Sequence, residues 1–193
     1  AYNEKFKFTS LFKMTTDILG AEPLIDGNKK YTFRAKAKEA DRILYSQESF
    51  EEYPDIWVTN GVFSFRHQIT HLGDQLKDFK WGAAELIRWE SEKGDSLDGV
   101  FIKPDGFDPE KKYPVIVFFY EKFSPLMYNF WKPQNRHLPY MPYYLADDYC
   151  FFLPDIVYRD GHPGRSSMQC IMPGLEKLNE MGYADTSRIG IWG

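Results

Sequence analysis

The chain of 193 residues is 43% hydrophobic and 18% aromatic, which is enough apolar material for one large packed domain or two small ones. Its net charge of −4 at pH 7 argues against a nucleic-acid partner, because such proteins carry a basic face. Its apolar runs have the length of strands and fall well short of the roughly 18 residues of a membrane span. We therefore expect neither nucleic-acid binding nor a membrane span in this chain.

The N-terminus and the cysteines leave the compartment open. The opening residues, Ala1-Tyr-Asn-Glu-Lys5, lead into Phe/Lys alternation and lack the apolar core of a signal peptide, although a leader could lie upstream. Cytoplasmic, periplasmic and secreted locations are all compatible with this. Cys150 and Cys170 fit neither a zinc spacing nor a disulfide framework, so we expect two buried thiols. We expect no cofactor and no metal.

Residues 1–80 predict an all-β segment. Residues 31–37 alternate cleanly between apolar and polar side chains, as a half-buried strand does, and residues 5–13 alternate more weakly. The expected strands are 5–13, 31–37, 42–47, 55–59 and 65–70. Short strands separated by turns are typical of a sandwich or of one propeller blade, and the segment holds no internal repeat.

Two pairs of side chains in this segment have spacings that could bind ligands. His67 and His71 are four residues apart, which on a helix would suit a metal, but the motif lacks the glutamate of a zincin and its surroundings predict a strand. Glu51 and Glu52 could bind an amine, yet they lie in a polar link between strands. We interpret both pairs as solvated loop residues.

The second half of the chain predicts a hairpin followed by a parallel sheet. The hairpin pairs 85–90 with 97–103 around a Gly-Asp turn. Unbroken apolar runs at 115–119, 149–153 and 189–192 are typical of strands that are covered on both faces. A helix expected at 167–181 separates the last two runs, and strand-helix-strand order indicates parallel pairing.

This helix carries both a start and a stop signal. Gly182 follows it as a C-cap, but Pro173 lies inside the pattern, so we expect a kink or a true start only at Pro173.

Before the second apolar run, the stretch 123–148 is rich in tyrosine and proline, with a helix near 141–147. Its aromatic residues either line a substrate entrance or pack the connection onto the domain.

Four motifs together resemble the prolyl oligopeptidase family of serine peptidases, and in particular its dipeptidyl-peptidase-like branch. The motifs are 45–58 (YSQESFEEYPDIWV), 89–103 (WESEKGDSLDGVFIK), 111–120 (KKYPVIVFFY) and 181–193 (MGYADTSRIGIWG). The resemblance implies the last blade of a β-propeller in residues 1–80. It implies the N-terminal half of an α/β-hydrolase domain, with a mostly parallel sheet, in residues 81–193. The intact protein would cleave short peptides by acyl-enzyme chemistry, with a propeller that restricts entry.

The last motif resembles the run into a nucleophile elbow, Gly-x-Ser-x-Gly. Gly193 would be its first glycine, and the serine would follow two positions later. No Gly-x-Ser-x-Gly is present in the chain itself. Because these enzymes have the order serine, acid, histidine, His162 is not the general base, and the whole triad would lie beyond Gly193. The 193 residues alone would then be inactive and poorly stable.

Within the resemblance, Tyr120 corresponds to a tyrosine whose hydroxyl helps to stabilise the oxyanion. The chain departs from the family pattern directly afterwards, where 121–125 (EKFSP) replaces smaller residues. Arg159 is a candidate substrate-site residue in a loop with Asp-x-Arg-Gly-like character, where it would brace the site, pair with Asp155 or Asp160, or remain solvated. Ester hydrolysis and a non-catalytic interaction protein remain alternatives, and the intact protein could be a homo-oligomer.

Overall fold

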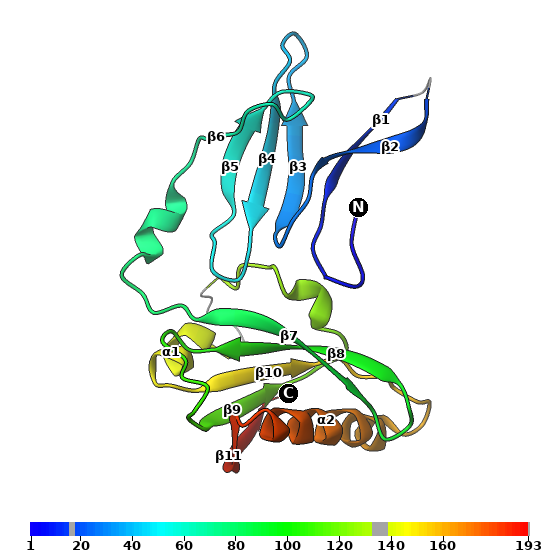
Figure 1. The fold of residues 1–193 in the computed structure, drawn as a ribbon, viewed down its shortest axis with the longest axis vertical. Helices are drawn as coiled ribbons and strands as arrows, with labels where there is room; N and C mark the ends of the chain where they lie inside the picture. Colours follow the sequence, from blue (N-terminus) through cyan, green and yellow to red (C-terminus); the bar gives the residue numbers. More distant parts are fainter. Residues whose placement is uncertain (16–17, 133–138, 193) are drawn as a thin grey trace. The chain divides into compact units, whose positions relative to one another are not determined.

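The computed structural model describes residues 1–15, 18–132 and 139–192, and its chain divides into two compact units. The first unit comprises Ala1–Asp78 with Tyr128–Trp131, and the second comprises Phe79–Met127 with Lys132–Gly193 (Figure 1). No helix in the described residues is long and apolar enough to cross a membrane.

The first unit is built from antiparallel sheets. Its main sheet has the order β3-β4-β5-β6, and β1 and β2 form a separate two-stranded sheet (Figure 1). The strands are β1 (Leu11–Thr15), β2 (Ile18–Ile25), β3 (Lys30–Lys36), β4 (Ile43–Glu48), β5 (Asp55–Thr59) and β6 (His67–Gln68), followed by the 3-10 helix η1 (Leu72–Leu76). The all-β prediction is thus confirmed.

The strand expected at 5–13 is wrong in its bounds, since β1 begins only at Leu11. Lys7 has a φ of 63°, in the left-handed region, so the chain cannot run through this residue as an extended strand. The strand β2 was not predicted, because Gly20 and Pro23 interrupt its alternation.

Aromatic rings form the core of the first unit. The ring of Tyr45 is fully buried, and the rings of Tyr31, Trp57 and Phe63 lie 6.5, 6.5 and 5.3 Å from it. Residue Phe130, from the tyrosine-rich stretch, packs edge-on against Tyr53 at 5.2 Å. Part of the tyrosine-rich stretch therefore packs onto the first unit.

The second unit contains a mixed five-stranded sheet of order β11-β9-β10-β8-β7 (Figure 1). Its strands are β7 (Ala83–Glu90), β8 (Ser96–Lys103), β9 (Tyr113–Phe118), β10 (Cys150–Pro154) and β11 (Ala184–Trp192). The strand β9 pairs in parallel with β10 and β11, whereas β8 pairs antiparallel with β7 and β10. The expectation of a mostly parallel sheet is wrong. The β7–β8 hairpin joins the same sheet and adds two antiparallel pairings, so the sheet is mixed.

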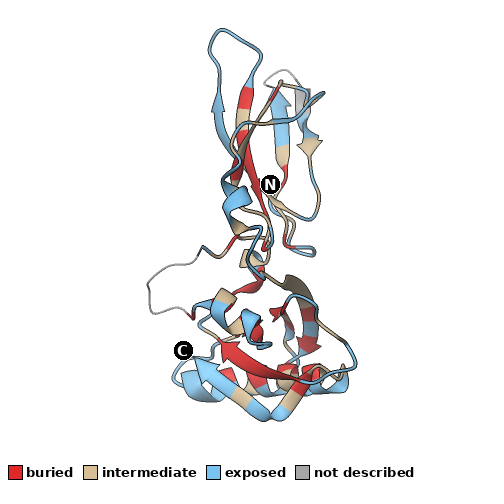
Figure 2. Cartoon of the chain, turned by 90° about the vertical axis from the view of Figure 1, so that its left-hand side faces the viewer, coloured by how far each residue is buried: buried red, intermediate tan, exposed pale blue. Residues whose placement is uncertain are grey.

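Two helices cover opposite faces of this sheet. The short helix α1 (Met141–Ala146) contacts one face through the ring of Tyr144, which lies 5.9 Å from Phe151. The long helix α2 (Pro163–Glu180) lies against Phe152, the next residue, which points to the other face. The strands β9 and β10 are consequently buried at every position, as their unbroken apolar runs predicted (Figure 2).

Of the two expectations for α2, a kink or a start only at Pro173, the late start is wrong. The helix runs from Pro163, a proline in the first turn, through Pro173 to Glu180. A proline at 173 cannot donate to the carbonyl of Gln169, but the N–H of Glu92, in the β7–β8 turn, donates to that carbonyl at 3.0 Å. The hairpin thus supplies the hydrogen bond that the proline removes.

The end of α2 was predicted correctly. Gly182 has a φ of 82°, and its N–H donates to the carbonyl of Asn179. The next N–H, of Tyr183, donates to the carbonyl of Leu178 at 3.1 Å, which completes a Schellman motif. This stop turns the chain directly into β11.

The centre of the second unit is a close contact between α2 and the hairpin. The ring of Trp89 lies 5.3 Å from that of Phe152, and its Nε1 donates to the carbonyl of Cys170 at 2.8 Å. Gly99 and Gly174 flank these two rings, and a Cβ at either glycine would come within 2.8 Å of a ring carbon. The missing side chains let the helix approach the sheet.

Candidate functional site

The carboxyl ends of β9, β10 and β11 meet at one edge of the sheet, because the three strands run parallel. The helix that follows β9, α1, covers one face of the sheet, and the helix that follows β10, α2, covers the other. In open α/β sheets, ligands bind outside the carboxyl ends of strands whose connections part in this way. This edge is therefore the candidate active site.

A shallow hollow of about 490 Å³ lies at this edge. Its lining residues come from the two connections and are Phe119, Tyr120, Glu121, Tyr158 and Pro163. The side chain of Tyr120 is 79% exposed, so its hydroxyl is free to meet a ligand. The last residue of β9, Phe118, pairs with Trp192 at the end of β11, which brings both strand ends beside the hollow.

The residues that follow β9 are held by those that follow β10. We call residues 119–124 the Tyr120 loop and residues 155–158 the anchoring segment. The N–H of Ile156 donates to the carbonyl of Glu121 at 2.7 Å, and the Tyr158 hydroxyl donates to the carbonyl of Tyr120. Both bonds fix the backbone of the Tyr120 loop while leaving the Tyr120 ring exposed.

The carboxylate of Asp155 is the third contact between these segments, and it is only 7% exposed. It accepts hydrogen bonds from the N–H groups of Phe123 and Ser124 at 2.7 and 2.8 Å and from the Ser124 hydroxyl at 2.5 Å. Sequence reasoning missed this role. The available signal was an aspartate directly after a buried apolar strand, at the end where functional groups gather.

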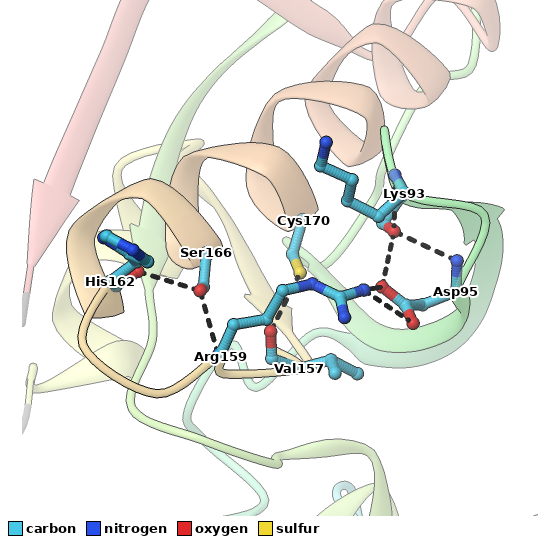
Figure 3. Close-up of polar contacts among 8 residues, drawn as sticks. Lys93, Asp95, Val157, Arg159, His162, Ser166 and Cys170 are labelled. Carbon is cyan, nitrogen blue, oxygen red and sulfur yellow. Dashed lines mark hydrogen bonds and ion pairs between the residues drawn. The ribbon is translucent and has the colours of Figure 1, made fainter.

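The guanidinium of Arg159 pairs with Asp95, at 2.9 and 3.3 Å from the two carboxylate oxygens (Figure 3). The pairing expected with Asp155 or Asp160 is thus corrected. Asp95 is oriented in turn by the Ser91 hydroxyl, which donates to it at 2.9 Å. Arg159 therefore ties the anchoring segment to the β7–β8 turn, in a geometry that suits a brace.

The histidines and cysteines were expected to have no catalytic role. His67 and His71 are both exposed, one in β6 and one just before η1, and the two do not share a helix. The carbonyl of His162 accepts a hydrogen bond from the Ser166 hydroxyl at the start of α2 (Figure 3). Both thiols are buried, and burial raises the pKa of Cys150 to about 12 and raises that of Cys170. Among the described residues, no group of three His, Cys, Asp or Glu side chains is arranged to hold a metal ion.

The predicted nucleophile elbow falls on Gly193, which lies outside the described residues. The strand that leads to it, β11, is formed, but the expectation that both its faces are covered is wrong. Ile191 is 66% exposed, because β11 is the edge strand of the sheet and pairs only with β9 in the described residues.

Comparison with solved structures identifies similar folds. The acylaminoacyl peptidase of Pyrococcus horikoshii matches 96% of this chain with a TM-score of 0.66 and 22% identity. The dipeptidyl peptidase 4 of Porphyromonas gingivalis matches 97% with a TM-score of 0.70 and 15% identity, and the AtxE2 isopeptidase matches 94% with a TM-score of 0.70 and 12% identity. The chain has the fold of peptidases of the prolyl oligopeptidase type.

The match to prolyl oligopeptidase-type peptidases confirms at the level of fold the resemblance that the motifs indicated. The chain spans 28–30% of the length of these three structures. A scan against protein-family models finds no match, and a search of curated proteins finds none either.

Proposed function

We propose that this chain forms part of a serine peptidase of the prolyl oligopeptidase family, which hydrolyses short peptides through an acyl-enzyme intermediate. Residues 1–80 would be the last part of a β-propeller, and residues 81–193 the N-terminal half of the α/β-hydrolase domain. The serine would lie two positions after Gly193, with the acid and the histidine further on, so that these 193 residues alone would be inactive.

The observation that carries the proposal is the placement of Tyr120. Its exposed ring lies at the hollow where the carboxyl ends of β9 and β11 adjoin, which is where a chain continuing from Gly193 would emerge. The strand order also agrees with this reading, since an antiparallel hairpin precedes strands that alternate with helices on opposite faces.

In this mechanism the serine hydroxyl attacks the scissile carbonyl, and the carbonyl oxygen gains negative charge. The Tyr120 hydroxyl, a neutral donor, would donate a hydrogen bond to that oxygen alongside the backbone N–H that follows the serine. Arg159 would act on the site indirectly, by bracing the anchoring segment through Asp95. The substrate is a peptide, and this step requires neither metal nor cofactor.

The test is a fluorophosphonate probe applied to the whole protein that carries this sequence, with the labelled peptide mapped by mass spectrometry. Label on a serine two positions after Gly193, together with hydrolysis of short chromogenic peptides, supports the proposal. Label with hydrolysis of esters but not peptides would indicate an esterase instead. A different residue at that position and no label would indicate a non-catalytic interaction protein.

A further inference from the structure

The Asp155 carboxylate is a buried group that the proposed reaction does not itself use. It lies just beyond β10, and its own N–H donates to the carbonyl of Asp98 in β8 at 2.9 Å. Its position is therefore set by the sheet. Its side chain then reaches across to the Tyr120 loop rather than into the hollow, whose lining does not include it.

The bonds that Asp155 accepts are specific to one loop conformation. A single oxygen, Oδ1, accepts from two successive backbone N–H groups, those of Phe123 and Ser124, while Oδ2 accepts from the Ser124 hydroxyl. Ser124 is fully buried, so these donors would find no water to replace the carboxylate. The loop cannot shift without leaving buried donors unsatisfied.

Resting on the function proposed above, we propose that Asp155 is a positioning residue for the reaction: it fixes the Tyr120 loop so that the Tyr120 hydroxyl is aimed at the oxyanion. Tyr120 is three residues from the first anchored N–H and has an exposed ring, so packing does little to orient its side chain. Its aim depends on the backbone that carries it. Because oxyanion donors must be in place before the charge develops, holding this backbone still contributes to kcat.

The kinetic experiment compares Asp155→Ala with Tyr120→Phe and with the double variant in the whole protein, using a short chromogenic peptide. We expect Tyr120→Phe to lower kcat by about 10²–10³-fold, as for loss of one oxyanion donor. Asp155→Ala should lower kcat by about 10²-fold with little change in KM, since misplacing a reacting group by about 1 Å costs that much. The double variant should be scarcely slower than Tyr120→Phe, because a hydroxyl that is absent cannot be misaimed.

Conservative variants and a control separate positioning from general damage. Asp155→Asn should retain most of the activity, because its amide oxygen still accepts both N–H groups and its amide nitrogen can donate to the Ser124 oxygen. Asp160→Ala removes an exposed aspartate five residues away and should match the unmodified protein. If Asp155→Ala does not fold, Ser124→Ala removes the hydroxyl bond alone, and its smaller loss of kcat should likewise vanish in the Tyr120→Phe background.

Hydrogen exchange gives a readout that does not depend on activity. In Asp155→Ala, peptides covering the Tyr120 loop should exchange faster, while those covering β8 keep their protection. Additive kinetic losses, or unchanged exchange in the loop, would overturn the role of Asp155 in an active enzyme. If the unmodified protein neither hydrolyses peptides nor takes the probe, the proposed function falls, and with it the catalytic part of this inference.

Discussion

Replacing Gly174 by alanine would place a methyl group against the two rings at the centre of the second unit. The new Cβ would lie 2.8 Å from Cζ of Phe152 and 3.0 Å from Cε2 of Trp89. Neither ring has room to retreat, because Phe152 is fully buried and Trp89 is tied to the Cys170 carbonyl. Overpacking of this kind costs about 1–3 kcal/mol, against a gain of roughly 1 kcal/mol from replacing a helical glycine by alanine.

The matched control is Gly164→Ala, in the first turn of the same helix. Nothing lies within 4 Å of a Cβ built there, so only the gain in helix propensity remains. We expect Gly174→Ala to lower the free energy of unfolding by about 1 kcal/mol and Gly164→Ala to raise it by about 0.5 kcal/mol. Urea unfolding of the two variants, followed by tryptophan fluorescence, measures both changes. Equal stabilisation by both would refute the close approach of α2 to the sheet.

Three further predictions concern buried or paired side chains. Asp55→Ala should lower the free energy of unfolding by about 1–3 kcal/mol in the same urea assay. The buried Asp55 carboxylate accepts hydrogen bonds from the Thr70 hydroxyl and from the N–H groups of Leu72 and Gly73, which the variant would leave without this acceptor. As a control, replacing an exposed aspartate by alanine should have little effect. The free energy of unfolding should fall as pH rises from 9 toward 12, because native Cys150, with a pKa of about 12, keeps a proton that the unfolded thiol loses. In Cys150→Ala, the free energy of unfolding should fall less steeply with pH over the same range. Arg159→Ala should cost below about 1 kcal/mol and leave KM for peptides unchanged, whereas a marked rise in KM would indicate substrate binding.

Local sequence patterns were sufficient to predict a strand, or the end of a helix, wherever its position depends on its own residues. Residues 55–59 form β5 with the predicted bounds, and the unbroken run at 115–119 overlaps the buried strand β9, which ends at Phe118. Gly182 ends α2 because a left-handed residue is needed there and glycine adopts it without cost.

The misses arise where the deciding partner is distant in the sequence. Pro173 is tolerated because the N–H of Glu92, 81 residues earlier, satisfies the carbonyl that it leaves unpaired. The exposure of β11 depends on its place at the sheet edge, which its apolar composition does not reveal. At the candidate site, the resemblance indicated Tyr120, but the hydrogen bonds of Asp155 join segments about 30 residues apart and could not be inferred from either segment alone.

The β7–β8 turn has a consequence for engineering. Hairpin tips are usually the places where a chain accepts a tag or an extra residue. This tip is bonded twice to the chain after β10, once from the Glu92 N–H to the Gln169 carbonyl within α2 and once from Asp95 to Arg159, which precedes α2. One added residue would move both partners out of register with α2, whose first residue, Pro163, lines the hollow. The length of this turn is therefore expected to be as constrained as that of a core element.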